Sequence, residues 1–424
     1  MIRTIRNNPL LYFLFFVFCL NQRTISQNNK IDSIYKMLPC IKPELNRIGN
    51  DSIGLKFFYQ QLRLLKNDSS ERVSIVHIGD SHIQADNFSG KMREHFQIEF
   101  GNAGRGLIFP YALAKTNGQE SFKSSSNTIW ESKRCVFPNL PLPIGISGIT
   151  IFTTDSSAEI KISLSTWRSF DYSASKIILF HEKGKGAYDF IVYDTLRNIQ
   201  GFINSNLKSE SPFTSEVIFD TLVNQLIIKA YKSNPFQQIA QIYGLLVEND
   251  SKGILYHTIG VNGAEYRHYN AAEKFKVQLP ALRPDLIIIS LGTNDAFPKG
   301  FNPTVFYNNI DILIKSIQEN NPNANILLTT PSDSFRGKGK SRHNNSDMKI
   351  ARNTIVEYCN KNNLAYWDFY EIMGGYGSIQ KWKVKGLVQK DYLHFSKAGY
   401  ELQGDLFYNA IINGFKIFEL NGLR

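Results

Sequence analysis

The sequence predicts an α/β protein: a doubly wound, mostly parallel sheet of five strands, into which an antiparallel β-sandwich module is inserted. Three observations lead to this prediction. At 424 residues the chain has room for roughly two or three domains. In the first and last parts of the chain, apolar runs alternate with helix-length amphipathic segments, which is typical of βαβ units. Between about residues 115 and 250 the runs are short and alternating, which is typical of antiparallel strands.

The first residues predict export. Arg3 and Arg6 precede "PLLYFLFFVFCL", an apolar run that is shorter than a membrane span and has the charge order of a secretory signal. Thr24 and Ser26 offer small side chains for cleavage, so we assign residues 1–26 to a signal peptide. We therefore expect a periplasmic or cell-surface protein, with an uncleaved anchor as the alternative. The signal segment is the only membrane contact that the sequence predicts.

Charge and cysteine content narrow the function classes. The net charge of +11 suits any anionic surface, but no zinc-finger spacing or aromatic-basic pattern points to nucleic acid, so we expect none to bind. After removal of the signal, Cys40, Cys135 and Cys359 remain at unrelated spacings. This pattern favours small buried side chains over a disulfide framework or a metal site.

The first part of the α/β domain follows an N-terminal helical segment, residues 27–70. Within that segment, residues 55–65 are predicted to form one helix that leads into the first strand. The domain itself starts at residues 71–115 with the buried strand "RVSIVHIGD". A helix comes next, predicted from an apolar side chain at every fourth position: Phe88, Met92, Phe96 and Phe100.

Residues 116–250 form the predicted insertion, a β-sandwich with runs such as "AEIKISLS", "KIILFHEK" and "QLIIKAY". Exposed loops tolerate such insertions. The α/β domain resumes over residues 251–424, with strands in "KGILYHTIGVNG", "DLIIISLG", "NILLTTP" and "AYWDF". Helices are predicted from Asn302 onward, from Met348 to Cys359, and after Ser396.

The stretch "VHIGDSHIQAD" places Gly79, Asp80 and Ser81 between a strand and a helix. In doubly wound sheets, ligands bind beyond the carboxyl ends of the strands. The Ser81 hydroxyl is therefore predicted to face a cleft, with its own N–H near a helix N-terminus, where negative charge is stabilised. On this fragment alone, a helix-capping serine is the alternative.

Three further motifs supply what a nucleophilic serine needs. Asp391 and His394 in "DYLHFSKAGY" are three positions apart, so the carboxylate can orient the imidazole as a general base. Gly263 in "GVNGAEY" and Asn294 in "SLGTNDAF" each follow a strand and can offer N–H groups to an oxyanion. The four motifs together predict nucleophilic acyl chemistry.

Residues near these motifs, and two tryptophans of the β module, have predicted structural roles. Asp80 is predicted to stabilise the turn rather than to act as an acid, and Asp295 to form a supporting hydrogen bond. His82 either shapes the cleft or forms a local hydrogen bond. Trp130 and Trp167 fit the core of the β module better than a sugar-stacking surface.

These motifs resemble those of SGNH (GDSL-type) hydrolases. The stretches "GDSHIQAD", "GNAGRGL" and "MGGYGSIQKW", with the inserted β module, are most similar to secreted peptidoglycan O-acetylesterases of that superfamily. The resemblance covers roughly residues 71 to 415. It implies a flavodoxin-like sheet, no metal and no cofactor. It also implies two residue sets: a catalytic triad of Ser81, His394 and Asp391, and an oxyanion hole of Ser81, Gly263 and Asn294.

We therefore expect a secreted serine esterase that removes O-acetyl groups from a cell-wall polysaccharide, most of all peptidoglycan. An acetylated glycan polymer is the expected partner. One alternative is an O-acetyltransferase, or a deacetylase that acts on another acetylated polysaccharide. Another is a carbohydrate-binding surface protein with a vestigial hydrolase domain. Excision of residues 116–250 is expected to spare small-ester cleavage and to weaken action on the polymer.

Overall fold

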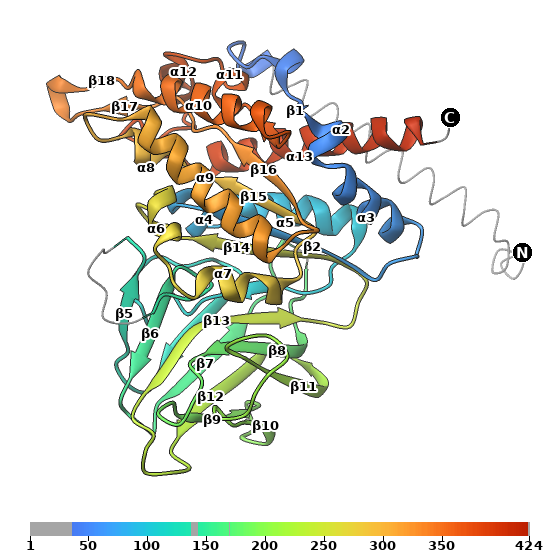
Figure 1. Ribbon diagram of the computed structural model, residues 1–424, viewed down its shortest axis with the longest axis vertical. Coiled ribbons are helices and arrows are strands. Elements are labelled where there is room, and N and C mark those ends of the chain that lie inside the picture. The colour runs from blue at the N-terminus through green and yellow to red at the C-terminus, as the bar shows by residue number, and fades with distance from the viewer. Residues whose placement is uncertain (1–35, 137–142, 169, 423–424) are drawn as a thin grey trace, which may run out of the picture.

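The structure is a computed structural model that describes residues 36–136, 143–168 and 170–422. The predicted signal peptide, residues 1–26, lies outside the described residues. Within the described ranges, no helix is both long and apolar enough to cross a membrane. Figure 1 shows a helix-covered sheet in the upper part of the molecule and antiparallel strands in the lower part.

The α/β part is built on a six-stranded sheet with the order β1-β19-β16-β15-β2-β14. Five strands are parallel, which confirms the predicted fold class, and the two-residue β1 adds an antiparallel edge next to β19. The strands are β1 Ile48–Gly49, β2 Arg72–Gly79, β14 Gly253–Gly260, β15 Leu286–Ser290, β16 Asn325–Thr329 and β19 Ala365–Trp367.

Helices connect these strands. The longer ones are α3 Lys56–Lys66, α5 Asn87–Phe100, α9 Pro303–Asn320, α10 Asp347–Lys361 and α13 Lys397–Asn421. The shorter ones are α2 Asp51–Gly54, α4 Ser81–Gln84, α6 Tyr266–Asn270, α7 Phe275–Gln278, α8 Thr293–Ala296, α11 Phe369–Ile372 and α12 Ser378–Val384. Three 3-10 turns are η1 Pro43–Leu45, η2 Leu279–Leu282 and η3 Gly339–Ser341, and a small hairpin pairs β17 Phe335–Arg336 with β18 His343–Asn344.

Both faces of the parallel sheet are covered by helices, so the sheet is doubly wound. Alternate side chains of β2 belong to two apolar clusters: Val76 packs with residues of α9 and α10, whereas Ile75 packs with residues of α3, α5 and α13. Helix α5 carries the predicted apolar stripe, of which Phe88 and Phe96 are fully buried. Helix α9 begins where predicted, because Asn302 Oδ1 accepts the first backbone N–H groups of the helix.

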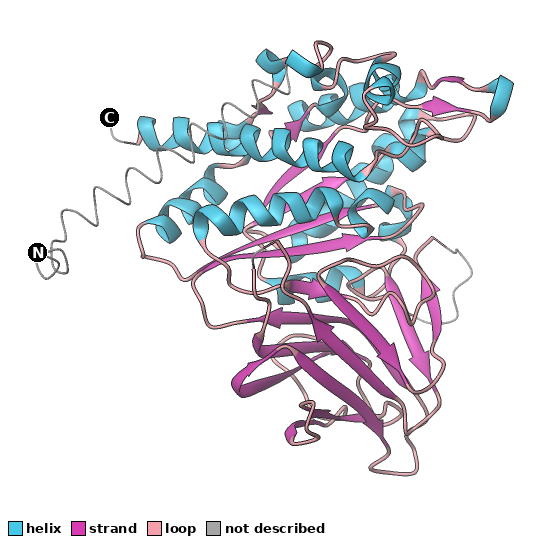
Figure 2. Cartoon of the chain, turned by 180° about the vertical axis from the view of Figure 1, so that it is seen from behind, coloured by secondary structure: helices cyan, strands magenta, loops and turns pink. Residues whose placement is uncertain are grey.

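The inserted stretch folds as two antiparallel sheets packed face to face (Figure 2). Their orders are β10-β9-β12-β7-β4 and β11-β8-β13-β6-β5. Strand β3, Gly106–Ile108, precedes the predicted boundary at residue 116 and pairs with β13. The other strands are β4 Phe122–Ser126, β5 Glu131–Arg134, β6 Ile149–Thr153, β7 Glu159–Leu164, β8 Ala174–His181, β9 Asp189–Tyr193, β10 Ile199–Ile203, β11 Thr214–Val223, β12 Gln225–Tyr231 and β13 Ala240–Glu248.

The apolar core of the sandwich is continuous with one side of the parallel sheet. Ile162 of one sandwich sheet and Leu179 of the other belong to the same buried cluster as Val76 of β2. Trp130 and Trp167 belong to this cluster too, which confirms their predicted place in the core. The module is therefore packed firmly against the α/β part.

A buried ion cluster also ties α5 to the module. Arg93 donates to both carboxylate oxygens of Asp86, at 3.0 and 2.6 Å, and Arg105 donates to the same carboxylate at 3.2 Å. Arg93 Nε donates to the hydroxyl of Tyr172 in the module at 3.2 Å. Burial raises the pKa of Asp86, but the two guanidinium groups outweigh burial and hold the pKa below its usual value.

Candidate active site

Ser81 lies where strand β2 ends and helix α4 begins, at the carboxyl edge of the parallel sheet. Asp80 caps this short helix, since its Oδ1 accepts the backbone N–H of His82 at 3.2 Å. Gly79 is required by close packing, because a Cβ there would lie only 2.9 Å from the carbonyl oxygen of Ser290. The Gly-Asp-Ser turn thus holds the Ser81 side chain at the rim of the sheet.

The side chains of Ser81, His394 and Asp391 form one hydrogen-bonded chain. Ser81 Oγ lies 3.2 Å from His394 Nε2, and His394 Nδ1 lies 2.7 Å from Asp391 Oδ2. The other carboxylate oxygen of Asp391 accepts the backbone N–H groups of Leu393 and His394, both at 3.0 Å. These bonds fix the loop before α13 so that the imidazole faces Ser81.

The charge of Asp391 sets the proton positions in this chain. Burial raises the pKa of Asp391, but hydrogen bonds from the His394 side chain and from the Leu393 and His394 backbone outweigh burial, so the pKa lies below its usual value. Asp391 is therefore ionised at neutral pH and can only accept a hydrogen bond. It follows that Nδ1 of His394 carries a proton, which leaves Nε2 of the neutral ring free to accept the proton of Ser81.

Gly263 occupies a tight turn after strand β14. The backbone N–H of Ala264 donates to the carbonyl of Val261 at 2.9 Å, and Gly263 has a φ of +79°. The φ of Asn262, the second residue of the turn, is not positive, whereas that of Gly263 is. The turn is therefore type II, with glycine at its third position. The Gly263 N–H belongs to the peptide that joins Asn262 to Gly263. The orientation of this peptide plane therefore sets the direction of the N–H.

Asn294, in helix α8, links the two turns. Its Nδ2 donates to Asp80 Oδ2 at 2.9 Å and to the carbonyl of Ala264 at 3.1 Å. Both of its N–H bonds are therefore engaged, whereas the sequence predicted a donor for an oxyanion. Donation to a substrate would require one of these bonds to be exchanged.

A hollow of about 540 Å³ opens in front of these groups. Ser81, Gly263, Asn294 and His394 line it together, so the structure brings the four predicted side chains and turns to one place. Most of the other polar lining consists of carboxamides, with a single lysine: Asn87, Asn117, Asn262, Gln389 and Lys397.

The start of the insertion also contributes to the site, which the sequence did not predict. Asn117 lines the hollow, and Glu120 pairs with Lys397 at 2.8 Å. The available signal was Gln84 in "GDSHIQAD": a polar side chain three positions after Ser81 on a buried helix needs hydrogen-bond partners from another segment.

The two acidic neighbours of the site differ in their electrostatics. Burial raises the pKa of Asp80, but the charge and hydrogen bonds of His82 outweigh it and hold the pKa low. His82 Nδ1 forms a local hydrogen bond with Asp80 Oδ1, and His82 also lines a small hollow beside Ser81 and His394. Asp295 forms the predicted supporting hydrogen bond, as its Oδ1 accepts the N–H of Tyr266 at 3.4 Å. Burial and the charge of Glu265 raise the pKa of Asp295 to about 8.

The sequence predicts neither a metal site nor a disulfide framework. Within the described ranges, no group of three or more His, Cys, Asp or Glu side chains is arranged to hold a metal ion. Cys40, Cys135 and Cys359 are free thiols, and Cys135 and Cys359 are buried.

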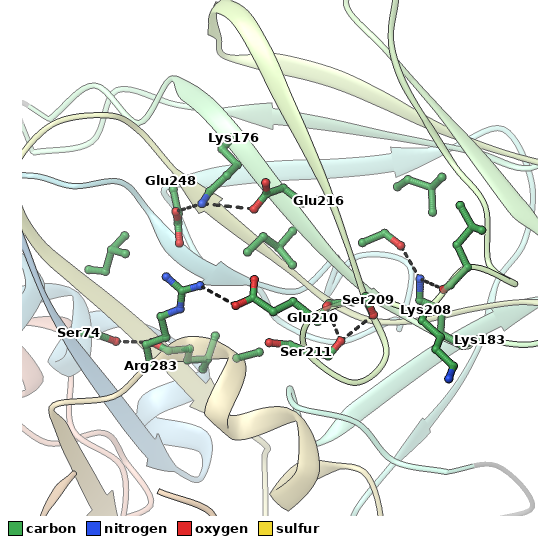
Figure 3. A pocket seen from close by; sticks show the side chains of 18 of the residues that line it. Ser74, Lys176, Lys183, Lys208, Ser209, Glu210, Ser211, Glu216, Glu248 and Arg283 are labelled. Carbon is green, nitrogen blue, oxygen red and sulfur yellow. Dashed lines mark hydrogen bonds and ion pairs between the residues drawn. The ribbon is translucent and has the colours of Figure 1, made fainter. Parts of the chain in front are cut away.

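A larger hollow, of about 630 Å³, lies between the module and the opposite edge of the parallel sheet (Figure 3). Its charges are largely paired, and Figure 3 shows Lys176 between Glu216 and Glu248, at 3.4 and 2.8 Å. This hollow is lined by Ser74, whose Oγ lies 3.1 Å from Nε2 of the buried His257.

The Ser74–His257 pair is not arranged for proton abstraction. His257 Nδ1 accepts the backbone N–H of Leu107 at 3.1 Å, so the ring proton lies on Nε2 and points toward Ser74. Ser74 Oγ in turn donates to the carbonyl of Leu282 at 2.7 Å. Ser81–His394 therefore has the arrangement of a nucleophile with its base, whereas Ser74–His257 does not.

The chain is similar to a known family and to solved structures. Residues 232–402 match the GDSL-like Lipase/Acylhydrolase family. A solved peptidoglycan O-acetylesterase superposes with a TM-score of 0.70 and 22% identity, over 85% of this chain and 96% of that chain. An acetyl xylan esterase covers 36% of this chain and 78% of its own at 19% identity and a TM-score of 0.30. A family two carbohydrate esterase from Clostridium thermocellum covers 62% and 94% at 13% identity and a TM-score of 0.27. A comparison with curated proteins finds no match.

The doubly wound sheet and the serine–histidine–aspartate chain at its carboxyl edge define the class of α/β ester hydrolases. Residues 232–402 of the protein match the GDSL-like lipase/acylhydrolase (SGNH) family, in agreement with the resemblance seen in the sequence. The matched range contains Gly263, Asn294, Asp391 and His394, whereas Ser81 precedes it. The inserted module explains this split, because it separates the strand that carries Ser81 from the rest of the domain.

Proposed function

We propose that the protein is a serine esterase that removes O-acetyl groups from a cell-wall polysaccharide, and that peptidoglycan is its substrate. The observation that carries this proposal is the hydrogen-bonded chain from Ser81 through His394 to Asp391. The substrate class is supported by the solved peptidoglycan O-acetylesterase. Its fold matches 85% of this chain, which is more than the α/β part alone could supply.

In the first step, Ser81 Oγ attacks the carbonyl carbon of the acetyl group. His394 Nε2 takes the hydroxyl proton, and the Asp391 carboxylate stabilises the resulting imidazolium. The N–H groups of Ser81 and Gly263 receive the oxyanion, and Asn294 joins them when one of its present bonds is exchanged. The intermediate then expels the sugar oxygen, which takes the proton from His394 and leaves an acetyl group on Ser81.

Water completes the cycle. His394 removes a proton from water as the oxygen attacks the acetyl-Ser81 ester, and the second oxyanion uses the same N–H groups. Acetate leaves, and the proton returns to Ser81 Oγ.

An O-acetyltransferase is the second candidate, since it forms the same acetyl-Ser81 and differs only in the acceptor. The amide-lined hollow of about 540 Å³ is an observation in its favour, because it offers a sugar acceptor room beside Ser81. Acetate release measured against acetyl transfer to a chitooligosaccharide separates the two activities. A binding protein with a vestigial site would not be labelled on Ser81 by a fluorophosphonate.

The cellular location is a proposal from sequence alone. Arg3, Arg6 and the apolar run that follows them support export to the periplasm or cell surface. N-terminal sequencing of the mature protein tests this, and an intact Met1 in a cytoplasmic fraction would contradict it.

The function is tested with Ser81→Ala. Turnover of an aryl acetate and acetate release from O-acetylated peptidoglycan should both be abolished, with the melting temperature unchanged. Ser74→Ala is the matched control, because it removes a different serine–histidine pair and should retain turnover. Activity that survives Ser81→Ala would reject the mechanism, and faster release from acetylated xylan than from peptidoglycan would reject the substrate.

A further inference from the structure

Gln84 connects three segments that are far apart in the sequence. Its side chain is fully buried at the end of α4, three positions after Ser81. Its Nε2 lies 3.0 Å from Thr116 Oγ1, 2.8 Å from the carbonyl oxygen of Asn117 and 3.0 Å from Asn117 Oδ1. Its Oε1 accepts the backbone N–H of Asn262 at 2.9 Å. One amide therefore joins the Ser81 helix, the first residues of the insertion and the Gly263 turn.

The Gly263 turn receives additional contacts from the same two segments. Asn262 Nδ2 donates to Asn117 Oδ1 at 2.7 Å, so the second residue of the turn is held through both its backbone and its side chain. Gly260, at the end of β14, has no space for a Cβ because the backbone of Gln84 lies directly against it. Strand β14 and α4 thus meet at van der Waals distance just before the turn.

This anchoring matters because a type II turn and a type I turn differ by a flip of the central peptide. The flip reverses the direction of the Gly263 N–H, and only one direction can serve an oxyanion at Ser81. The bond from the Asn262 N–H to Gln84 fixes the peptide that precedes this central one. We propose that Gln84 is a positioning residue for the Gly263 N–H, and that the start of the inserted module takes part in this positioning through Thr116 and Asn117.

The inference rests on the proposed role of Gly263 in the esterase mechanism. It also revises one expectation from the sequence. Excision of residues 116–250 would remove Thr116 and Asn117, the partners of Gln84 Nε2, so small-ester cleavage should fall together with action on the polymer.

The test is a double-mutant cycle on aryl acetate turnover. Gln84→Met removes both hydrogen-bonding ends and should lower kcat about 10-fold or more with little change in KM. Gly263→Ala should also lower kcat, because alanine disfavours a φ of +79°. When the two are combined, the loss should equal that of the stronger single variant, since both act on the same N–H. Losses that multiply, or a wild-type kcat in Gln84→Met, would overturn the proposal.

Gln97→Met is the matched control. Gln97 is also a buried helical glutamine whose Nε2 donates to backbone carbonyls, those of Gly104 at 2.9 Å and Ile254 at 3.2 Å, but it lies near the start of β14. It should lower the melting temperature and leave kcat unchanged. If Gln84→Met does not fold, the same cycle is run with Asn117→Ala, and the same two outcomes decide. Failure of the proposed function shows separately, as activity in Ser81→Ala.

Discussion

Asn294 Nδ2 donates a 2.9 Å hydrogen bond to Asp80 Oδ2, directly beside Ser81. Asp80 keeps its charge at neutral pH because His82 holds its pKa low. The second N–H of Asn294 points to the carbonyl of Ala264, so the amide is clamped between the Ser81 turn and the Gly263 turn. These two bonds hold the Asn294 amide near Ser81 before a substrate binds. In the transition state, the negative substrate oxygen competes with Asp80 and the Ala264 carbonyl for an N–H of Asn294.

Replacement of Asn294 by alanine is expected to lower kcat about 100-fold or more, because a donor to the oxyanion is lost. KM for a small ester should change little, since the interaction strengthens only in the transition state. Steady-state kinetics on an aryl acetate measures both constants. An unchanged kcat would remove Asn294 from the oxyanion role and leave it as a structural link.

Asp391→Asn keeps the shape of the side chain and removes its charge. The amide can present an N–H to His394 and favour the wrong ring tautomer, so kcat is expected to fall on the order of 1,000-fold or more. Asp311→Asn serves as a control, since that carboxylate forms a surface pair with Lys315 at 2.8 Å. Equal activity in the two variants would show that Asp391 does not orient the base.

Asp295 gives the protein a pH-dependent stability. Its pKa rises to about 8 in the folded state, whereas an aspartate in an unfolded chain titrates near 3.8. Between about pH 4 and pH 8, Asp295 is therefore protonated in the folded protein and ionised in the unfolded chain. By linkage, the contribution of Asp295 to stability is complete below about pH 4 and is lost as the pH rises through 8.

Asp295→Asn should remove this dependence, because the amide stays neutral. The free energy of unfolding of the variant minus that of the wild type is expected to rise with pH and to level off above pH 8, by a few kcal/mol. Denaturant unfolding between pH 5 and pH 9 measures the difference. A difference that stays constant across this range would contradict the raised pKa.

Asp86→Ala is expected to destabilise the fold by about 3–5 kcal/mol, because it leaves the charges of Arg93 and Arg105 buried without their carboxylate. Thermal unfolding measures the loss. Asp311→Ala, which breaks a surface pair with Lys315 and a hydrogen bond from the Tyr358 hydroxyl, should lower the melting temperature much less. Similar melting temperatures for the two variants would show that the cluster does not hold α5 to the module.

Much of the fold could be predicted, because strands such as "DLIIISLG" are unbroken apolar runs and α5 and α9 carry clear stripes. The edge strand β1 could not be predicted, since its two residues have no periodicity and exist as a strand only by pairing with β19. The pairing of β3 with β13 is of the same kind, because it depends on how the module docks.

Two parts of the candidate site could be predicted. Asp391 and His394 are three positions apart, a spacing that lets a carboxylate orient an imidazole. Ser81 follows a Gly-Asp pair at the end of an apolar run, which marks the end of a strand. The bonds of Asn294 to Asp80 and Ala264 could not be predicted, because they depend on the distance between two turns from different strands. The contact of Gln84 with Asn117 depends on the path of the inserted chain, which no local pattern encodes.

The hydrogen bond between Ser81 and His394 spans 313 positions of sequence. During synthesis, the nucleophile is made long before its base, and the two meet only after the whole β module has been laid down and α13 has docked. Closing so long a loop is among the slower events in folding. A nascent or truncated chain that ends before residue 391 would lack Asp391 and His394 and would thus have no esterase activity. Ester cleavage would therefore show that the entire fold has formed.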